Sequence, residues 1–505
     1  GSYTLDAQTT GRFNTAVGYS AGTEVTTGTH NTFLGDSSGA TTTTGINNVA
    51  VGQSALNANT TADNNTAVGM SALLANTTGA NNTALGYNSL LANTTAANNT
   101  AVGRNSLGAN TTGAQNTAVG QSAGLGITTG DYNQAFGYQS MNGGAVTGAS
   151  NSAFGAQTLQ VLTSGANNVA VGRHALAVNT TGASNTAIGF SSMSANTTGG
   201  NNTALGQYSL TANTTGYQTV SIGDESLAAS TTGATNVAVG YRALKANTTA
   251  SNNTAVGSSA LLANTTGTRN SAFGASSLPA NTTGSDNTAF GAYALSDATT
   301  AAYNTAVGRS ALGTTTTGAG NTALGYLGLS ANITGASNVA VGAFALDANT
   351  TADNNTAVGY NSLGANTTGA NNTAVGYTTL ALNTTGIGNS AFGVNALQTN
   401  TTGVGNSAFG SYHVGASNAA LNSNTTGDSN SAFGGGSLSA NTTASNNSGF
   451  GYRALATTTT GASNTAVGAS ALYANTTAGT NTAVGYNAGA AITTGGSNTF
   501  VGANV

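Results

Sequence analysis

The residues that could carry out acid–base or metal chemistry are few and lie far apart in this sequence. The three histidines, His30, His174 and His413, occupy different positions of a repeated pattern, and Asp224–Glu225 is the only adjacent pair of acidic residues. A general acid–base pair needs two facing groups, whereas this pair fits a solvated turn. The absence of cysteine excludes disulfides, thiolate metal sites and cysteine nucleophiles. We therefore expect no enzyme, no metal site and no cofactor.

The charge of the chain argues against two further classes of partner. Charged residues make up 4% of the 505 residues, and the formal net charge of −4 is spread along the whole length. Eight basic residues cannot cover a phosphate backbone, so we expect no nucleic-acid partner. No apolar run reaches the roughly 18 residues that a membrane span requires. We therefore expect no membrane insertion by this segment.

A repeat carries these scattered residues through the whole chain. A large apolar residue followed by glycine occurs 29 times, and 26 of the 28 intervals are 17 residues long, with one of 18 and one of 24. A fixed period is typical of stacked supersecondary units that share one core. The sequence therefore predicts an all-β fold, a parallel β-roll or β-solenoid of about 29 coils in a single continuous array over residues 1–505. Residues 1–11 and 498–505 read as partial repeats, so we expect a piece of a longer protein.

Each coil opens with an alternating segment that suits a short β-strand. In Val49-Ala50-Val51 the valines are two residues apart and share a face, so we expect both to face inward. Ala50 should then face outward or toward a tightly packed neighbour. The glycine that follows indicates a bend with positive φ or a close backbone approach. Five residues after the large apolar residue comes a second one, usually leucine. The predicted core and structural residues are thus Val68, Gly69 and Leu73 in one coil and Val239, Gly240 and Leu244 in another.

Four coils have glycine in place of that leucine. After three of these glycines, Gly22, Gly124 and Gly489, an apolar residue follows three positions later, and we expect it to fill the same core space. These replacements are Val25, Ile127 and Ile492. Gly39 has no such replacement, and the repeat pattern gives no explanation for its missing leucine.

The rest of each coil is Asn-Thr-Thr-Gly with asparagine-rich flanks, which is typical of turns. Equivalent asparagines in stacked strands would lie about 4.8 Å apart, close enough for their amides to hydrogen-bond along the stack. Asn-Thr-Thr also fits the N-glycosylation pattern, but repetition of one turn explains so many matches better. The threonine pairs could suggest ice binding. Because adjacent threonines in a strand point to opposite sides, only one per coil could join such an array, and we disfavour this reading.

Tyrosine follows the recurring glycine in nine coils, including those of Tyr19, Tyr87, Tyr241 and Tyr360. Such a column could form a contact between chains or an exposed aromatic stripe for glycans. We favour packing over glycan binding.

The interval of 24 residues marks an insertion. Between Gly410 and Leu421 lie ten residues, where an ordinary coil has three. Insertions in solenoids form surface loops because the stacked strands cannot absorb them. We therefore expect a loop at about residues 411–420 that carries Tyr412 and His413 outward as a candidate surface-binding loop. A tolerated insertion without a role is the alternative, and we favour it.

The repeats resemble those of known surface proteins. Asn-Val-Ala-Val-Gly at Asn48–Gly52 and Asn-Thr-Ala-Ile-Gly at Asn185–Gly189 resemble the head repeats of YadA-like trimeric autotransporter adhesins. The longer repeat at Asn355–Gly369 is similar to repeats in phage tail fibres. The resemblance covers essentially the whole array, although the period is longer than that of the adhesin heads. It implies a left-handed, trimeric parallel β-roll that acts in attachment.

A thin core favours the same assembly. Each coil offers two large apolar side chains plus alanines for 17 ordered residues, and sharing faces among three chains would bury more apolar surface. We therefore predict a homotrimeric structural fibre or adhesin shaft, extracellular on a virion or cell surface, that serves attachment to a host or surface. A phage tail fibre is favoured. The alternatives are a bacterial trimeric autotransporter adhesin head and a subunit of an extracellular filament. A host surface glycan or receptor is the predicted external partner.

Overall fold

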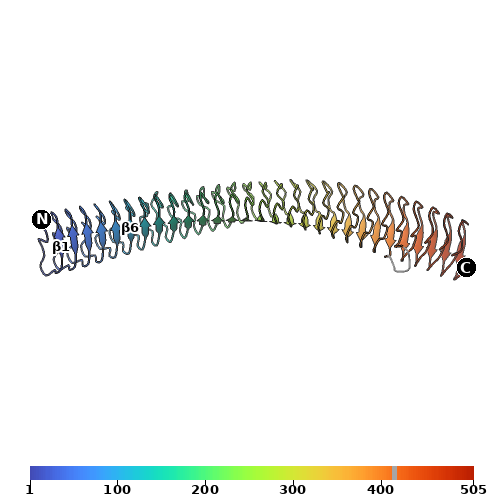
Figure 1. The fold of residues 1–505 in the computed structure, drawn as a ribbon, viewed down its shortest axis with the longest axis horizontal. Coiled ribbons are helices and arrows are strands. Elements are labelled where there is room, and N and C mark those ends of the chain that lie inside the picture. Colours follow the sequence, from blue (N-terminus) through green and yellow to red (C-terminus); the bar gives the residue numbers. More distant parts are fainter. Residues whose placement is uncertain (412–417) are drawn as a thin grey trace. The chain divides into compact units, whose positions relative to one another are not determined.

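The structure is a computed structural model and describes residues 1–411 and 418–505. The chain divides into two compact units, Gly1–Asn252 and Asn253–Val505, and each is described by itself. In both units the described residues form short β-strands joined by turns, and none of them forms a helix. Within each unit the strands lie side by side as a stack of coils, drawn as successive arrows in Figure 1.

The strands are three residues long and recur once per coil. Those of the first unit are β1 (Thr15–Val17), β2 (Thr32–Leu34), β3 (Val49–Val51), β4 (Thr66–Val68), β5 (Thr83–Leu85), β6 (Thr100–Val102), β7 (Thr117–Val119), β8 (Gln134–Phe136), β9 (Ser152–Phe154), β10 (Val169–Val171), β11 (Thr186–Ile188), β12 (Thr203–Leu205), β13 (Val220–Ile222) and β14 (Val237–Val239). Those of the second unit are β15 (Thr254–Val256), β16 (Ser271–Phe273), β17 (Thr288–Phe290), β18 (Thr305–Val307), β19 (Thr322–Leu324), β20 (Val339–Val341), β21 (Thr356–Val358), β22 (Thr373–Val375), β23 (Ser390–Phe392), β24 (Ser407–Phe409), β25 (Ser431–Phe433), β26 (Ser448–Phe450), β27 (Thr465–Val467), β28 (Thr482–Val484) and β29 (Thr499–Val501).

Hydrogen bonds between successive coils hold each stack together. Strands pair in parallel with the same position of the next coil, so that Val51 of β3 lies opposite Val68 of β4. The turns continue this ladder, because the backbone N–H of Leu73 donates to the carbonyl oxygen of Ser89 at 3.0 Å. The predicted parallel β-solenoid with a 17-residue repeat is therefore confirmed.

The strand side chains face the opposite way to the prediction. In β3 the central Ala50 is fully buried, whereas Val49 and Val51 on either side of it are half-buried. Val68 and Val239 are half-buried as well. The expectation that the large strand residues fill the core of their own coil is therefore wrong. The interior is narrow and already holds the leucine of each turn, so a small residue fits at the strand centre.

The leucine of the turn is the main core residue. Leu73 and Leu244 are fully buried, and their backbones lie in the left-handed region, with φ of 53° and 52°. This conformation costs about 1–2 kcal/mol for a residue with a Cβ. Burying a leucine side chain gains about 1.5–3 kcal/mol, which offsets that strain.

The recurring glycine meets both predicted requirements. Gly69 has φ of +133°, and a Cβ added to it would lie 2.5 Å from the carbonyl oxygen of Gly86 in the next coil. Gly240 has the same backbone conformation, with φ of +137°. Side chains are excluded at this position because successive backbones touch there.

Two columns of buried asparagines connect the coils. In the column before the strands, the Oδ1 atom of Asn65 accepts a hydrogen bond from the backbone N–H of Asn82 at 2.9 Å. In the column of the Asn-Thr-Thr turns, Nδ2 of Asn93 donates to Oδ1 of Asn76 at 2.8 Å and to the carbonyl oxygen of Ala96 at 3.0 Å. The predicted hydrogen bonding along the stack is confirmed. The turn asparagines are buried, so their Nδ2 atoms are inaccessible to a glycosyltransferase in the folded coil.

The turn column of asparagines runs in one direction and ends where the next coil lacks an asparagine. Each amide donates toward the preceding coil, so the last asparagine of a run keeps an Oδ1 atom without a donor. Among the described residues, such unpartnered buried atoms belong to Asn110, Asn213, Asn281, Asn441 and Asn475. The residues at the same point of the following coils are Ile127, Ser230, Ala298, Thr458 and Ile492.

Completing the column at one of these ends should stabilise the second unit. Ala298 occupies the position equivalent to Asn281 in the following coil and is fully buried. The Ala298→Asn variant would supply the missing N–H donor for Oδ1 of Asn281. We expect a gain of about 0.5–1.5 kcal/mol, measured as a higher urea midpoint of unfolding. Ala298→Asp is the control, because it has a similar size but buries a charge and offers no N–H. Equal midpoints for the two variants would contradict this account.

A phenylalanine explains the missing leucines at Gly22 and Gly39. Phe33 stands at the centre of β2, where most strands have alanine, and is fully buried. A Cβ on Gly22 would lie 2.7 Å from its ring, and one on Gly39 would overlap the ring. A Cβ on Gly489 would likewise lie 2.7 Å from the ring of Phe500 in β29. One ring thus occupies the space of the absent leucines.

The predicted apolar replacements are confirmed in part. Val25 and Ile127 are fully buried, so both fill the core of their coils. Ile492 is half-buried and lies in the last turn before β29, the final strand.

The stack keeps its register across the insertion. Phe409 of β24 lies opposite Phe433 of β25, an offset of 24 residues instead of 17. The backbone N–H of Ala420 donates to the carbonyl oxygen of Gly410 at 3.2 Å, a bond that ordinary coils make between residues three apart. The extra residues therefore lie between Gly410 and Ala420. Tyr412 and His413, the candidate binding residues, lie outside the described residues.

Candidate functional site

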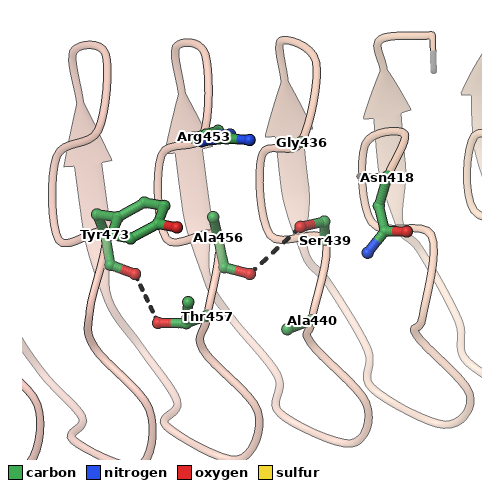
Figure 2. A pocket seen from close by; sticks show the side chains of 8 residues that line it. All are labelled: Asn418, Gly436, Ser439, Ala440, Arg453, Ala456, Thr457 and Tyr473. Atoms are coloured by element: carbon green, nitrogen blue, oxygen red, sulfur yellow. Dashed lines mark hydrogen bonds between the residues drawn. The ribbon is translucent and has the colours of Figure 1, made fainter. Parts of the chain in front are cut away.

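A pocket of about 190 Å³ lies beside the insertion in the second unit. Four successive coils contribute to it, as Figure 2 shows. Its lining residues are Asn418, Gly436, Ser439, Ala440, Arg453, Ala456, Thr457 and Tyr473. It is thus built where the repeat is least regular.

One glycine, Gly436, opens this pocket. It lies two residues after the recurring Gly434, at a position where other coils carry side chains such as that of Asn361. A Cβ on Gly436 would come within 3.3 Å of Cγ of Arg453 in the next coil. The missing side chain leaves the space that Arg453 borders.

The polar groups of the pocket are fixed by the neighbouring coils. The hydroxyl of Ser439 donates to the carbonyl oxygen of Ala456 at 3.3 Å, and that of Thr457 donates to the carbonyl oxygen of Tyr473 at 2.6 Å (Figure 2). Each hydroxyl oxygen can also accept a hydrogen bond.

The charged group of the pocket is the Arg453 guanidinium, which lies 5.4 Å from the ring centroid of Tyr452. No carboxylate or imidazole belongs to the described lining. The arrangement can hold a small polar or anionic group, but it offers no acid–base pair.

The structure does not bring the histidines together. The ring of His30 stacks on Phe13, with centroids 4.9 Å apart, and His174 meets Phe190 edge-on at 6.4 Å. His413 lies outside the described residues. Within the described chain, no group of three metal-ligating side chains forms, and no helix is long and apolar enough to cross a membrane.

One member of the acidic pair Asp224–Glu225 forms ion pairs with the next coil. The carboxylate of Glu225 lies 2.6 Å from Nε of Arg242 and 2.7 Å from Nζ of Lys245. Hydrogen bonds from Lys245 and Arg242 lower the pKa of Glu225 below its usual value. The sequence predicted a solvated turn here and missed these ion pairs.

Isolated acidic residues connect coils in a way that sequence reasoning missed. Oδ1 of Asp63 accepts a hydrogen bond from the backbone N–H of Ile46 in the preceding coil at 2.8 Å. Asp131, Asp353 and Asp428 make the same bond at 2.7 Å. These aspartates recur at one position of the repeat, and that recurrence could have revealed the hydrogen bond to the preceding coil.

The strand ends form an apolar surface feature. The last residue of every strand is Val, Leu, Ile or Phe, and each is half-buried or exposed in the described chain. We call this column of residues the strand-end stripe. Its rings stack where phenylalanines follow one another, with centroid distances of 4.7, 4.6 and 5.0 Å along Phe392, Phe409, Phe433 and Phe450. The stripe covers the sheet face that points away from the core.

The tyrosine column is also exposed. Tyr19, Tyr87, Tyr241 and Tyr360 all present large parts of their side chains to the outside. They do not pack into the core of their own chain, so a contact between chains and a glycan surface both stay open.

No protein-family model and no curated protein matches this chain.

Proposed function

We propose that this chain is a left-handed, homotrimeric structural shaft that serves attachment to a host cell or another surface outside the cell. The strand-end stripe is the observation that carries this proposal. Parallel sheets normally have both faces covered, and here the core covers only one face. A second face with one large apolar side chain per coil calls for a covering partner.

Further copies of the same chain fit the stripe best. A three-fold axis parallel to the stack would bring the same residue of each chain to one level, so a single stripe per chain closes the assembly. The extra apolar burial supplements a core that relies on one leucine and a few alanines per coil. The similarity of the repeats to adhesin heads and tail fibres points the same way.

The insertion in the repeat supports a role in attachment. The insertion at residues 411–420 interrupts the repeat beside the Arg453 pocket. A phage tail fibre is the favoured form, with a bacterial adhesin head or an extracellular filament subunit as alternatives. Electron micrographs of the native particle distinguish them, because a virion-attached fibre, a cell-surface projection and an open polymer differ in appearance.

Deleting residues 411–417 tests the attachment role of the insertion. The deletion restores the ordinary spacing between Gly410 and Leu421, so we expect an unchanged β-rich circular-dichroism spectrum. Weaker binding of the deletion variant to intact host cells would support a binding role for the insertion. Removal of one complete coil, residues 83–99, is the control that keeps the insertion. Unchanged attachment after the first deletion would refute the binding role, and unfolding would refute the placement of the insertion outside the core.

A further inference from the structure

Four aromatic rings form a continuous surface row in the second unit. Tyr326, Phe344, Tyr360 and Tyr377 come from consecutive coils, and their ring centroids are 5.4, 5.8 and 5.4 Å apart. The three tyrosines are 44%, 47% and 54% exposed, and Phe344 is half-buried. We call these residues the aromatic row. They present ring surface to the outside of each coil.

The row is continuous because one residue reaches across a gap. Ala343 occupies the position after the recurring glycine in its coil, so the tyrosine of the neighbouring coils is missing there. The next residue, Phe344, has φ of 58°, and its ring lies between those of Tyr326 and Tyr360. Without it the row would be broken after the first ring.

A hollow of about 340 Å³ lies at the beginning of the row. Its wall includes Leu327, which directly follows Tyr326, and the remaining lining residues are Ser296, Ser310, Gly313, Thr314, Ser330 and Ala331. The hydroxyl of Ser296 donates to the carbonyl oxygen of Gly313 at 2.7 Å, and that of Thr314 donates to that of Ser330 at 2.8 Å. The hydroxyl oxygens keep lone pairs that can accept hydrogen bonds from a ligand.

Further hydrogen-bonding groups lie beside the row. A Cβ on Gly364 would overlap Oδ1 of Asn361 and lie 3.4 Å from Oδ1 of Asp347, so these two oxygens are near neighbours. Asn361 directly follows Tyr360 in the chain. An amide and a carboxylate thus belong to the same coils as Phe344 and Tyr360.

We propose that the aromatic row and the adjoining hollow bind a neutral, linear polysaccharide. The inference rests on the proposed attachment function and names its ligand class. A pyranose ring has an apolar C–H face that packs on an aromatic ring, and its edge carries hydroxyls for serine, asparagine and aspartate to bind. One ring per coil offers a repeating platform for a repeating polymer.

The charge around the row favours this ligand over other stacking polymers. Single-stranded nucleic acid also stacks on aromatic side chains, but it needs a positively charged groove. The coils of the row carry Asp347 and Asp353, and Arg309 is the cation of the coil before them. An anionic polysaccharide is disfavoured for the same reason.

Calorimetric titration of the full chain with cellohexaose and maltohexaose tests the proposal, with an alginate hexamer as the anionic comparison. We expect a neutral oligosaccharide to bind and the alginate to bind at least tenfold more weakly. Tyr360→Ala should weaken binding about tenfold, and Tyr360→Phe should retain it. Tyr303→Ala is the matched control, because Tyr303 is 70% exposed on a different turn. Failure of both neutral probes, tighter binding of alginate, or an equal loss in Tyr303→Ala overturns the proposal.

The native mass of each variant separates this proposal from the trimer. If Tyr360→Ala dissociated the assembly, the row would be a contact between chains and the glycan proposal would fail. If the unchanged chain were a monomer that still bound the neutral oligosaccharide through Tyr360, the glycan site would stand and the homotrimeric shaft would fall.

Discussion

Replacing Phe33 by alanine is expected to destabilise the coils around β2 by about 3–5 kcal/mol. The ring is fully buried and fills the space that leucines fill elsewhere, while Gly22 and Gly39 offer no side chain to replace it. Since coils contact only their neighbours, the loss should remain local. Amide hydrogen exchange should show faster opening near β2 and unchanged protection in distant coils of the same unit.

A compensating variant makes this prediction stringent. Gly39→Leu alone should destabilise the fold, because its side chain would overlap the Phe33 ring. Combined with Phe33→Ala, the same leucine restores the alanine-and-leucine core of an ordinary coil, and its φ of 57° matches that of core leucines such as Leu73. The double variant should therefore recover much of the lost protection. A double variant no more stable than Phe33→Ala would contradict the claim that the Phe33 ring fills the volume of the missing leucine.

Placing charges in the strand-end stripe should weaken self-association without unfolding the chain. Val102, Val119 and Phe136 end consecutive strands and are half-buried or exposed in the single chain. Changing all three to aspartate would bury unpaired charges between the chains, at a cost of about 3–5 kcal/mol for each unpaired buried charge. We expect the trimer to dissociate at a lower urea concentration, measured by sedimentation. Its dissociation constant should rise at least about 100-fold.

The matched control places aspartates on another face of three consecutive coils, two of which carry the substituted residues Val102 and Val119. The second threonine of each turn, as at Thr95, Thr112 and Thr129, is exposed away from the strand. Three aspartates there should leave the assembly intact. Equal weakening by both triple variants would mean that added charge, and not the stripe, governs association.

The sequence predicted the architecture well because the period is a property of the stack. Equivalent residues meet when coils are placed on one another, so the glycine contact at Gly69 and the asparagine columns followed from position alone. The direction of the strand side chains did not follow from position alone. A three-residue strand such as Val49–Val51 is apolar on both faces, and residue size favoured the wrong face. The large side chains point outward, away from the core of their own chain.

Features that depend on contacts between coils also could not be predicted from the sequence. Gly22 is explained by the Phe33 ring of the following coil, and Phe344 joins the tyrosine column from one position further along the chain. Alignment of the repeats by position separates residues that lie next to each other in the folded stack. The pocket beside the insertion likewise depends on Gly436, which the repeat pattern alone marks only as a substitution.

The central claim is that the strand-end stripe is covered by two further copies of the chain. Native mass spectrometry of the unchanged chain at micromolar concentration tests it most directly. The account predicts a single species with the mass of three chains, and its loss in the Val102, Val119 and Phe136 aspartate variant. A stable monomer, soluble and folded with its stripe exposed, would contradict it.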